Sequence, residues 1–150
     1  YKASIAKNNG CDFVINYSNE NFETKVNDYT NNYGADVIYD AVGKDTFEKG
    51  LNCLAKRGRI VSYGISSGKI DPIDINKLRP LSASIATGGL LEYTKNIDEY
   101  QKNADELFDL VHEAKIKIQI YKEYKFDEIQ KAHIELEQRK SVGKIIINLR

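Results

Sequence analysis

The middle of the chain, residues 35–68, reads ADVIYDAVGKDTFEKGLNCLAKRGRIVSYGISSG. Two short apolar runs, residues 35–40 and 59–64, predict β-strands, and small turn residues follow each of them. Between the strands, apolar residues recur three or four positions apart, which predicts a helix with one buried face. That face is formed by Phe47, Leu51 and Leu54. A strand, a helix and a second strand in succession indicate a βαβ unit with parallel strands.

The start of this helix carries a capping pattern. Asp45 stands three residues before Glu48, which is the spacing of a capping box with Asp in place of Ser or Thr. We therefore expect Asp45 to be the N-cap residue. Gly58 is expected to end the turn that leads into the second strand.

The rest of the chain continues the alternation. Further helices are expected at residues 1–9, at 90–115 with a bend near Asn96, and at 126–139. Residues 18–20 are expected to lead into another helix, which includes Phe22, Val26 and Tyr29. Further strands are expected at residues 13–17, 82–87, 117–120 and 144–148. The apolar faces of these helices are expected to hold Phe22, Val26 and Tyr29, then Leu107, Leu110 and Val111, then Ile129, Ala132, His133 and Leu136.

This alternation predicts an α/β fold, a Rossmann-like doubly wound parallel sheet covered by helices on both faces. No repeat or linker interrupts it, so residues 1–150 are expected to form one domain. The chain has 22 basic and 22 acidic residues and is 41% hydrophobic, which argues against disorder and against a nucleic-acid-binding protein. No apolar run approaches about 18 residues, so we expect no membrane span.

The residues that could bind a metal are scattered along the chain. Cys11 and Cys53 form no CxxC pair, and His112 and His133 are remote from both. This spacing predicts free thiols and no zinc site. His112 is expected to be an exposed helix residue and His133 a structural one, and no Ser-His-Asp or Cys-His constellation can be argued from the spacing.

Three predicted strand ends carry small or hydroxyl residues, at residues 16–18, 40–43 and 64–68. A doubly wound sheet binds its ligands at the carboxyl ends of its strands. These turns therefore favour a ligand site, although Gly and Ser are also ordinary turn residues. The dinucleotide fingerprint G-x-G-x-x-G is absent, so either the chain binds no dinucleotide or the fingerprint precedes Tyr1. Because the chain lacks methionine and opens inside a helical pattern, we expect it to be a piece of a longer protein.

Four stretches carry a family resemblance: KNNGCDFVINYSNENF, GADVIYDAVGKDTFEKGLNCLAKRGRIVSYGISSG, ADELFDLVHEAKIKI and YKFDEIQKAHIELEQRKSVGKIIINL. In this order they resemble the zeta-crystallin-like quinone oxidoreductases, zinc-independent members of the medium-chain dehydrogenase/reductase superfamily. The resemblance implies that residues 1–150 are a partial NAD(P)-binding Rossmann domain, truncated at its N-terminal side, without its first strands and its glycine-rich loop. It also implies that about the last 30 residues return toward a GroES-like catalytic domain that this chain lacks.

The resemblance implies a set of cofactor-binding residues. Lys2 falls where the family often pairs a basic residue with the 2′-phosphate of NADP, and Tyr17 falls where a tyrosine lies against the adenosine end. Two further groups line the nicotinamide side, namely Ala41, Val42 and Gly43, and Tyr63, Gly64 and Ser66. The alternatives are a solvated helix lysine at position 2 and a half-exposed tyrosine at position 17. The family often has Ser at position 41, Phe at 63 and a polar residue at 65, where this chain has Ala, Tyr and Ile.

The implied parent protein is a cytoplasmic, NADPH-dependent enzyme that reduces quinones or related carbonyl electrophiles without a metal. No catalytic residue is named, because such a site acts by holding the nicotinamide near the acceptor. The resemblance implies a homodimer through the sheet edge at residues 82–87 and an inactive isolated chain. The alternatives are a non-catalytic dimerisation or cofactor-half module, a structural remnant of a split gene, and a Rossmann-like methyltransferase.

Overall fold

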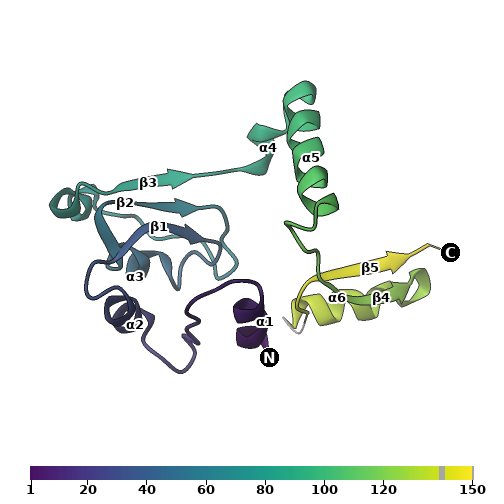
Figure 1. Ribbon diagram of the computed structural model, residues 1–150, viewed down its shortest axis with the longest axis horizontal. Coiled ribbons are helices and arrows are strands. Elements are labelled where there is room, and N and C mark those ends of the chain that lie inside the picture. Colours follow the sequence, from purple (N-terminus) through teal and green to yellow (C-terminus); the bar gives the residue numbers. More distant parts are fainter. Residues whose placement is uncertain (139–140, 150) are drawn as a thin grey trace. The chain divides into compact units, whose positions relative to one another are not determined.

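The computed structural model describes residues 1–138 and 141–149. The chain divides into two compact units, Tyr1–Glu92 and Tyr93–Arg150, and each combines helices with parallel strands (Figure 1). The α/β class and the parallel pairing predicted from the sequence are confirmed. Whether residues 1–150 act as one partial Rossmann domain stays a prediction.

The first unit holds a parallel sheet with strand order β1-β2-β3. Its elements are α1 (Lys2–Asn8), α2 (Phe22–Tyr29), β1 (Ala35–Asp40), α3 (Phe47–Leu51), β2 (Leu54–Ser62), the 3-10 helix η1 (Ile75–Leu81) and β3 (Ser84–Thr87). Asp40 of β1 stands beside Ser62 of β2, and Ser62 stands beside Thr87 of β3. The carboxyl ends of the three strands therefore lie side by side at the same end of the sheet.

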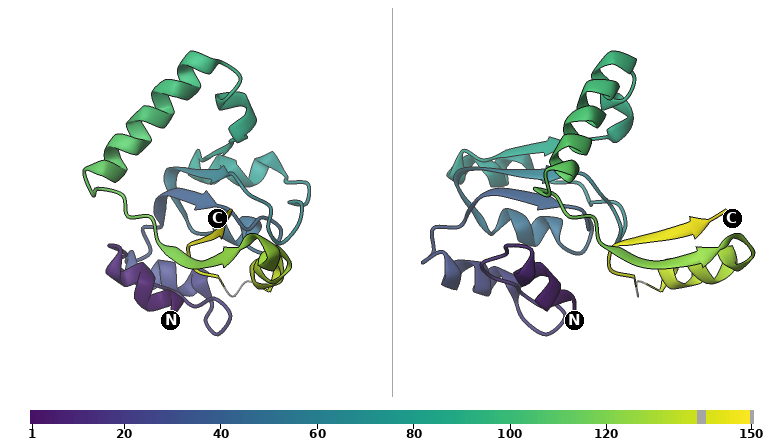
Figure 2. Two further views of the ribbon diagram at one scale, coloured as in Figure 1. Left: turned by 90° about the vertical axis from the view of Figure 1, so that its right-hand side faces the viewer. Right: turned by 45° about the vertical axis from the view of Figure 1, so that its right-hand side comes forward.

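The core of this unit lies between the sheet and α3. Phe47 and Leu51 of α3 and Leu54 and Ile60 of β2 form one buried cluster. The predicted burial of Phe47, Leu51 and Leu54 is confirmed, but Leu54 lies in β2 and not on the helix. Side chains of residues 70–85 close the cluster from the η1 side, and α3 covers one face of the sheet (Figure 1 and Figure 2). Burying a phenylalanine as fully as Phe47, which is 1% exposed, stabilises the fold by roughly 1.5–3 kcal/mol.

The opposite face of the sheet is not covered in the same way. Val37 and Tyr39 alternate with the inward Ile38 along β1 and are 48% and 72% exposed. Within the first unit, α3 packs on β1 and β2.

Two predicted strands differ from the structure because a strand forms only where a partner pairs with it. Residues 13–17 are predicted to be a strand but form no ladder with any described strand, and the Phe13 ring instead stacks on Tyr29 with centroids 4.3 Å apart. Residues 117–120 are also predicted to be a strand, yet pairing begins only at Ile120. The apolar alternation was right, but the partner determines where the strand starts.

The predicted cap of α3 is wrong. The residue before the helix is Thr46, and no side chain caps it. The Phe47 amide instead donates to the Gly43 carbonyl oxygen at 2.8 Å, and the Asp45 amide donates to Ser67 Oγ at 3.0 Å. A contact within the turn therefore satisfies the amide of Phe47, the first residue of the helix. β2 is also longer than predicted, because it begins at Leu54 rather than at residue 59.

The second unit holds a two-stranded parallel sheet, β4-β5. The chain enters it through α4 (Leu90–Tyr93) and α5 (Ile97–His112), and continues through β4 (Ile120–Lys125), η2 (Phe126–Glu128), α6 (Ile129–Glu137) and β5 (Lys144–Asn148). The predicted bend near Asn96 is confirmed, because Asn96 caps α5 and accepts from the amides of Asp98 and Glu99.

The helices of the second unit bury less than expected. Leu107 on α5 is 49% exposed, and Leu136 on α6 is 58% exposed, so neither lies in a core. His112 is exposed as predicted, and His133 is exposed as well. Ala132 is the buried residue of α6, and Arg139, the expected helix end, lies outside the described residues. Within the described ranges, no helix has the length and apolar character needed to cross a membrane.

A polar cluster joins β4 to α6. Lys122 Nζ lies 3.3 Å from Glu135 Oε1 and 4.6 Å from the centroid of the Tyr124 ring. Interaction with the Tyr124 hydroxyl and then with Lys122 holds the pKa of Glu135 below its usual value. This cluster is the main electrostatic link between the helix and the sheet in the part of the second unit that is described.

Candidate functional site

Two loops meet at the carboxyl ends of β1 and β2. The first follows Asp40 and the second follows Ser62. Ser67 joins them, because its amide and its hydroxyl both donate to the Val42 carbonyl oxygen at 2.8 Å. The Lys44 amide donates to the Gly68 carbonyl oxygen at 3.2 Å. The two loops therefore form one hydrogen-bonded surface at the carboxyl ends of the strands, which is where ligands of this fold class bind.

A buried carboxylate shapes the first loop. Asp40 is 6% exposed, and its Oδ1 accepts from the amides of Val42 at 2.7 Å and Gly43 at 2.9 Å. The Thr46 hydroxyl lies within 3.1 Å of both carboxylate oxygens. A buried charge is tolerated when donors surround it in this way. Sequence reasoning did not identify this role, although an Asp followed by a tight turn is the pattern of an Asx turn.

Two glycines allow the loops to approach each other. A Cβ added at Gly64 would lie 2.5 Å from the Ala41 carbonyl oxygen, and one added at Gly43 would lie 2.7 Å from the Gly68 carbonyl oxygen. Gly43 also has a φ of +92°, which L side chains rarely adopt. Both positions were predicted as site residues, and the structure shows that each one is required for the contact between the loops.

An apolar hollow of about 320 Å³ lies beside this surface. It brings three of the predicted residues together, Tyr17, Ala41 and Val42. Phe22 and Val26 of α2 complete one wall, and the Tyr17 and Phe22 rings meet edge to face with centroids 6.4 Å apart. A flat apolar group fits such a wall.

The remaining predicted residues lie at the rim or elsewhere. Tyr63 is 57% exposed, its amide donates to the Asp40 carbonyl oxygen at 3.0 Å, and Ser66 is exposed. Lys2 is the first residue of α1, is exposed, and does not line the hollow. The structure thus gathers the residues of both loops and Tyr17, while Lys2 belongs to a separate helix.

The hollow also contains a thiol that sequence reasoning did not assign. Cys53 is 2% exposed, and its Sγ lies 3.4 Å from the Lys49 carbonyl oxygen. Burial, followed by the charge of Glu23, raises the pKa of Cys53 to about 11, so the thiol stays protonated at neutral pH. A protonated buried thiol is a poor nucleophile, so Cys53 is not suited to nucleophilic catalysis.

The described residues offer little for a metal. No group of three or more His, Cys, Asp or Glu side chains within residues 1–138 and 141–149 comes close enough together to hold an ion. Cys11 and Cys53 differ in burial as well as position, since Cys11 is exposed. A zinc centre needs three or four such ligands together, so the donor set of the described chain does not fit zinc.

The sequence matches the family described as zinc-binding dehydrogenase over residues 9–147. Among curated relatives, a quinone oxidoreductase of Pseudomonas aeruginosa is 35% identical over 147 residues, which are 97% of this chain and 45% of that protein. A 2-haloacrylate reductase of a Burkholderia species is 34% identical over 148 residues, with 97% and 44% covered. The chain therefore spans less than half the length of these relatives.

Solved structures agree in fold. A quinone oxidoreductase of Pseudomonas syringae superposes with a TM-score of 0.88 at 34% identity, over 99% of this chain and 46% of that one. The Escherichia coli quinone oxidoreductase complexed with NADPH gives a TM-score of 0.88 at 32% identity, with 99% and 46% covered. The fold is that of the C-terminal, Rossmann-like half of these proteins.

Proposed function

The chain belongs to the zinc-binding dehydrogenase family, and from this membership we propose that it is the cofactor-side portion of an NADPH-dependent quinone reductase. The observation that carries the proposal is the joined surface of the two loops, with Tyr17, Ala41 and Val42 around one apolar hollow at the carboxyl ends of the strands. Membership in a dehydrogenase family leaves no support for the methyltransferase alternative.

The cofactor would contact two regions of the chain. Tyr17 would place its exposed ring against the adenosine end, and Lys2, an exposed residue of α1, would place its ammonium group beside the 2′-phosphate. The nicotinamide end would lie against residues 41–43 and against Tyr63, Gly64 and Ser66. Gly43 is buried and Gly64 is half-buried, and neither places a side chain between the two loops.

NADPH supplies the hydride, and the acceptor is a quinone or a related carbonyl electrophile. The residues of this chain bind and orient, and none of them is assigned a catalytic role. Asp40 is occupied by its own loop, and the Cys53 thiol is protonated, so neither is suited to proton transfer. We also propose that the reaction needs no zinc, in line with the donor set.

The assembly and setting follow the same proposal. The parent protein would be cytoplasmic and would pair as a homodimer through the outer edge of β3, where Ser84 and Thr87 are exposed. The isolated chain would be inactive, since it spans under half of the relatives. The same coverage supports the second candidate, a non-catalytic cofactor-half or dimerisation module, or the remnant of a split gene.

Isothermal titration calorimetry of the chain with NADPH and NADH tests the proposal. We expect NADPH to bind more tightly, and we expect Lys2→Ala to remove most of that preference, about tenfold, because a charge-assisted contact with the 2′-phosphate is lost. Lys7→Ala is the matched control, because Lys7 lies in the last turn of the same helix. Equal binding of the two cofactors, or an equal effect of both variants, would contradict the assignment of Lys2.

A further inference from the structure

The end of α1 carries an asparagine followed by a glycine. Asn9 is the only asparagine in the sequence that precedes a glycine, Gly10. In this arrangement the backbone nitrogen of Gly10 can reach the side-chain carbonyl carbon of Asn9 and close a five-membered ring. Glycine has no side chain to hinder that approach. Both residues are exposed, so water reaches the reacting atoms.

The space around Gly10 is open. A Cβ built at this position would meet no atom within 4 Å, and φ is +97°. Neither a side chain nor a packed neighbour therefore limits the rotation of this residue. The backbone of Gly10 can turn toward the Asn9 side chain without displacing another part of the fold.

Two hydrogen bonds occupy the reacting groups while α1 is intact. The Asn9 side-chain nitrogen Nδ2 donates to the Ile5 carbonyl oxygen at 2.8 Å, and the Gly10 amide donates to the Lys7 carbonyl oxygen at 3.1 Å. Ring closure needs a Gly10 nitrogen that has lost its proton and an Asn9 side chain that is free to turn. The reaction therefore requires the end of α1 to open first.

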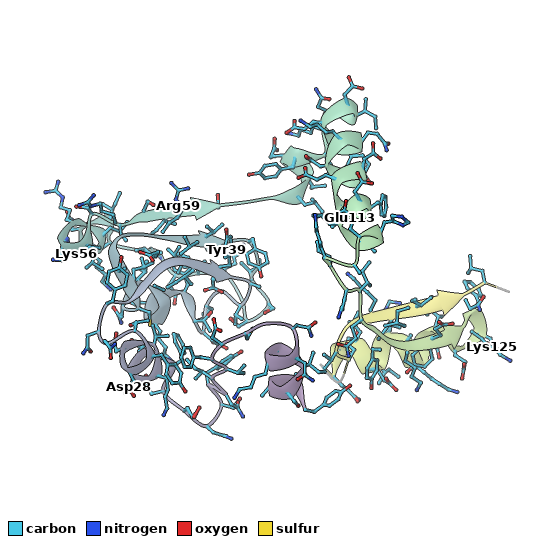
Figure 3. The ribbon with its side chains drawn as sticks, in the orientation of Figure 1. Asp28, Tyr39, Lys56, Arg59, Glu113 and Lys125 are labelled. Atoms are coloured by element: carbon cyan, nitrogen blue, oxygen red, sulfur yellow. The ribbon has the colours of Figure 1, made fainter. Side chains whose placement is uncertain are left out.

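α1 has little to keep it closed. The helix has 7 residues, none of them is buried, and Tyr1 before it makes no side-chain cap. Figure 1 and Figure 3 show α1 away from the strands of the first unit. A helix shorter than about 12 residues is marginal in water unless tertiary packing supports it. Segments of this kind open far more often than the whole fold does.

We propose that Asn9 is a site of spontaneous deamidation, which proceeds when α1 opens. The Gly10 nitrogen gives up its proton to hydroxide and attacks the side-chain carbonyl carbon of Asn9. A bond forms between these two atoms, the bond from that carbon to Nδ2 breaks, and Nδ2 leaves as ammonia. Water then opens the cyclic imide at either of its carbonyl carbons and leaves an aspartate or an isoaspartate at position 9. No oxidant, reductant or cofactor takes part.

The product changes the charge at the end of the helix. The sequence has 22 basic and 22 acidic residues, so one further carboxylate gives 22 against 23 and a net charge of −1. The carbonyl end of a helix favours a positive group such as Lys7 in the last turn of α1, and it disfavours a negative one. Deamidation should therefore weaken α1 and not only mark it.

The test incubates the purified 150-residue chain at about pH 8 and follows it by anion-exchange chromatography and peptide mass spectrometry. We expect an acidic form to accumulate, with a mass gain of about 1 Da on the peptide that contains Asn9. The rate should rise about tenfold for each pH unit near neutrality, because the Gly10 nitrogen reacts without its proton. Asn8 is the internal control and should convert at least about tenfold more slowly, because the residue after it carries a side chain.

Three variants test the mechanism. Asn9→Gln keeps a carboxamide but would have to close a larger ring, so the acidic form should not accumulate at a comparable rate. Ala3→Gly weakens an exposed position of α1 and should speed the conversion of Asn9 by up to about fivefold. Tyr1→Asp supplies the missing cap and should slow it by up to about fivefold. Circular dichroism with urea unfolding verifies that each variant keeps the fold.

Several results would overturn the proposal. These are the absence of an acidic form, a conversion of Asn8 as fast as that of Asn9, and an Asn9→Gln chain that acidifies at the unmodified rate. Equal rates in Ala3→Gly and Tyr1→Asp would contradict the requirement that α1 opens. No cofactor is present, so the outcome is independent of the proposed NADPH site.

Discussion

Replacing Gly64 by alanine should separate the two loops of the site. The new Cβ would lie 2.5, 2.9 and 3.0 Å from the carbonyl oxygen, the Cα and the carbonyl carbon of Ala41, all of them backbone atoms. Since ordinary contacts begin at 3.4 Å, the loops must move apart by about 0.9 Å (3.4 minus 2.5). That movement would break the hydrogen bond from the Ser66 amide to the Ala41 carbonyl oxygen, which is already 3.4 Å long.

The magnitude follows from two effects. Overpacking against backbone that cannot rotate away costs about 1–3 kcal/mol, and the lost hydrogen bond adds about 1 kcal/mol. The free energy of unfolding should therefore fall by roughly 2–4 kcal/mol, a large part of the roughly 5–15 kcal/mol that a domain possesses. Urea denaturation followed by circular dichroism should show a midpoint lower by about 1–2 M, at an m-value of about 2 kcal/mol/M.

The control is Gly88→Ala. A Cβ at Gly88 would meet no atom within 4 Å, so this variant should change the free energy of unfolding by no more than about 0.5 kcal/mol. The reasoning fails if Gly64→Ala unfolds at the same urea concentration as the unmodified chain. It fails equally if Gly88→Ala is destabilised as much as Gly64→Ala.

Three further experiments test the site and the second unit. Asp40→Ala should lower the free energy of unfolding by roughly 3 kcal/mol, because the loop amides and the Thr46 hydroxyl lose their buried acceptor. Asp40→Asn should lower it by only about 1 kcal/mol. Equal losses for the two variants in urea unfolding would contradict this account of the loop. At pH 8 about one Cys53 thiol in a thousand is ionised, and Cys11 is exposed, so alkylation followed by mass spectrometry should label Cys11 first. Labelling of both cysteines at the same rate would show that Cys53 is not buried. The pKa of Glu135 is lower in the folded chain than in the unfolded one, so its contribution to stability is present above the usual pKa and is lost as pH falls through the folded pKa. Glu135→Gln should therefore flatten the acid limb of thermal unfolding below about pH 5, and an unchanged limb would refute the link.

Helices and strands were predictable from the sequence where the spacing of apolar residues close together in the chain determines them. Phe47 and Leu51 face the core because residues three or four apart share one side of a helix, and both are buried. β1 was predicted at its observed bounds, because an apolar run with turn residues on both sides has few alternatives. Residues 13–17 have a similar pattern and still form no strand, because pairing depends on a partner that spacing cannot supply.

The positions of several site residues were predictable from the sequence, but the hydrogen bonds that shape the site were not. Gly43 and Gly64 were found because small residues follow the strand ends, and the structure places both where the loops touch. The roles of Asp40 and Ser67 depend on contacts outside a simple pattern, and Ser67 bonds a residue 25 positions away. The hollow also needs α2 beside β1, which no sequence pattern specifies.

The central claim is that the loops at the carboxyl ends of β1 and β2 contact NADPH. Amide chemical-shift mapping of the ¹⁵N-labelled chain, titrated with NADPH to millimolar concentration, tests it most directly. The account predicts that the largest shifts belong to the amides of Val42, Gly43, Gly64 and Ser66, together with Tyr17, and that NADH shifts them less at equal concentration. Shifts confined to the second unit, or no shifts at the loop amides, would contradict the account.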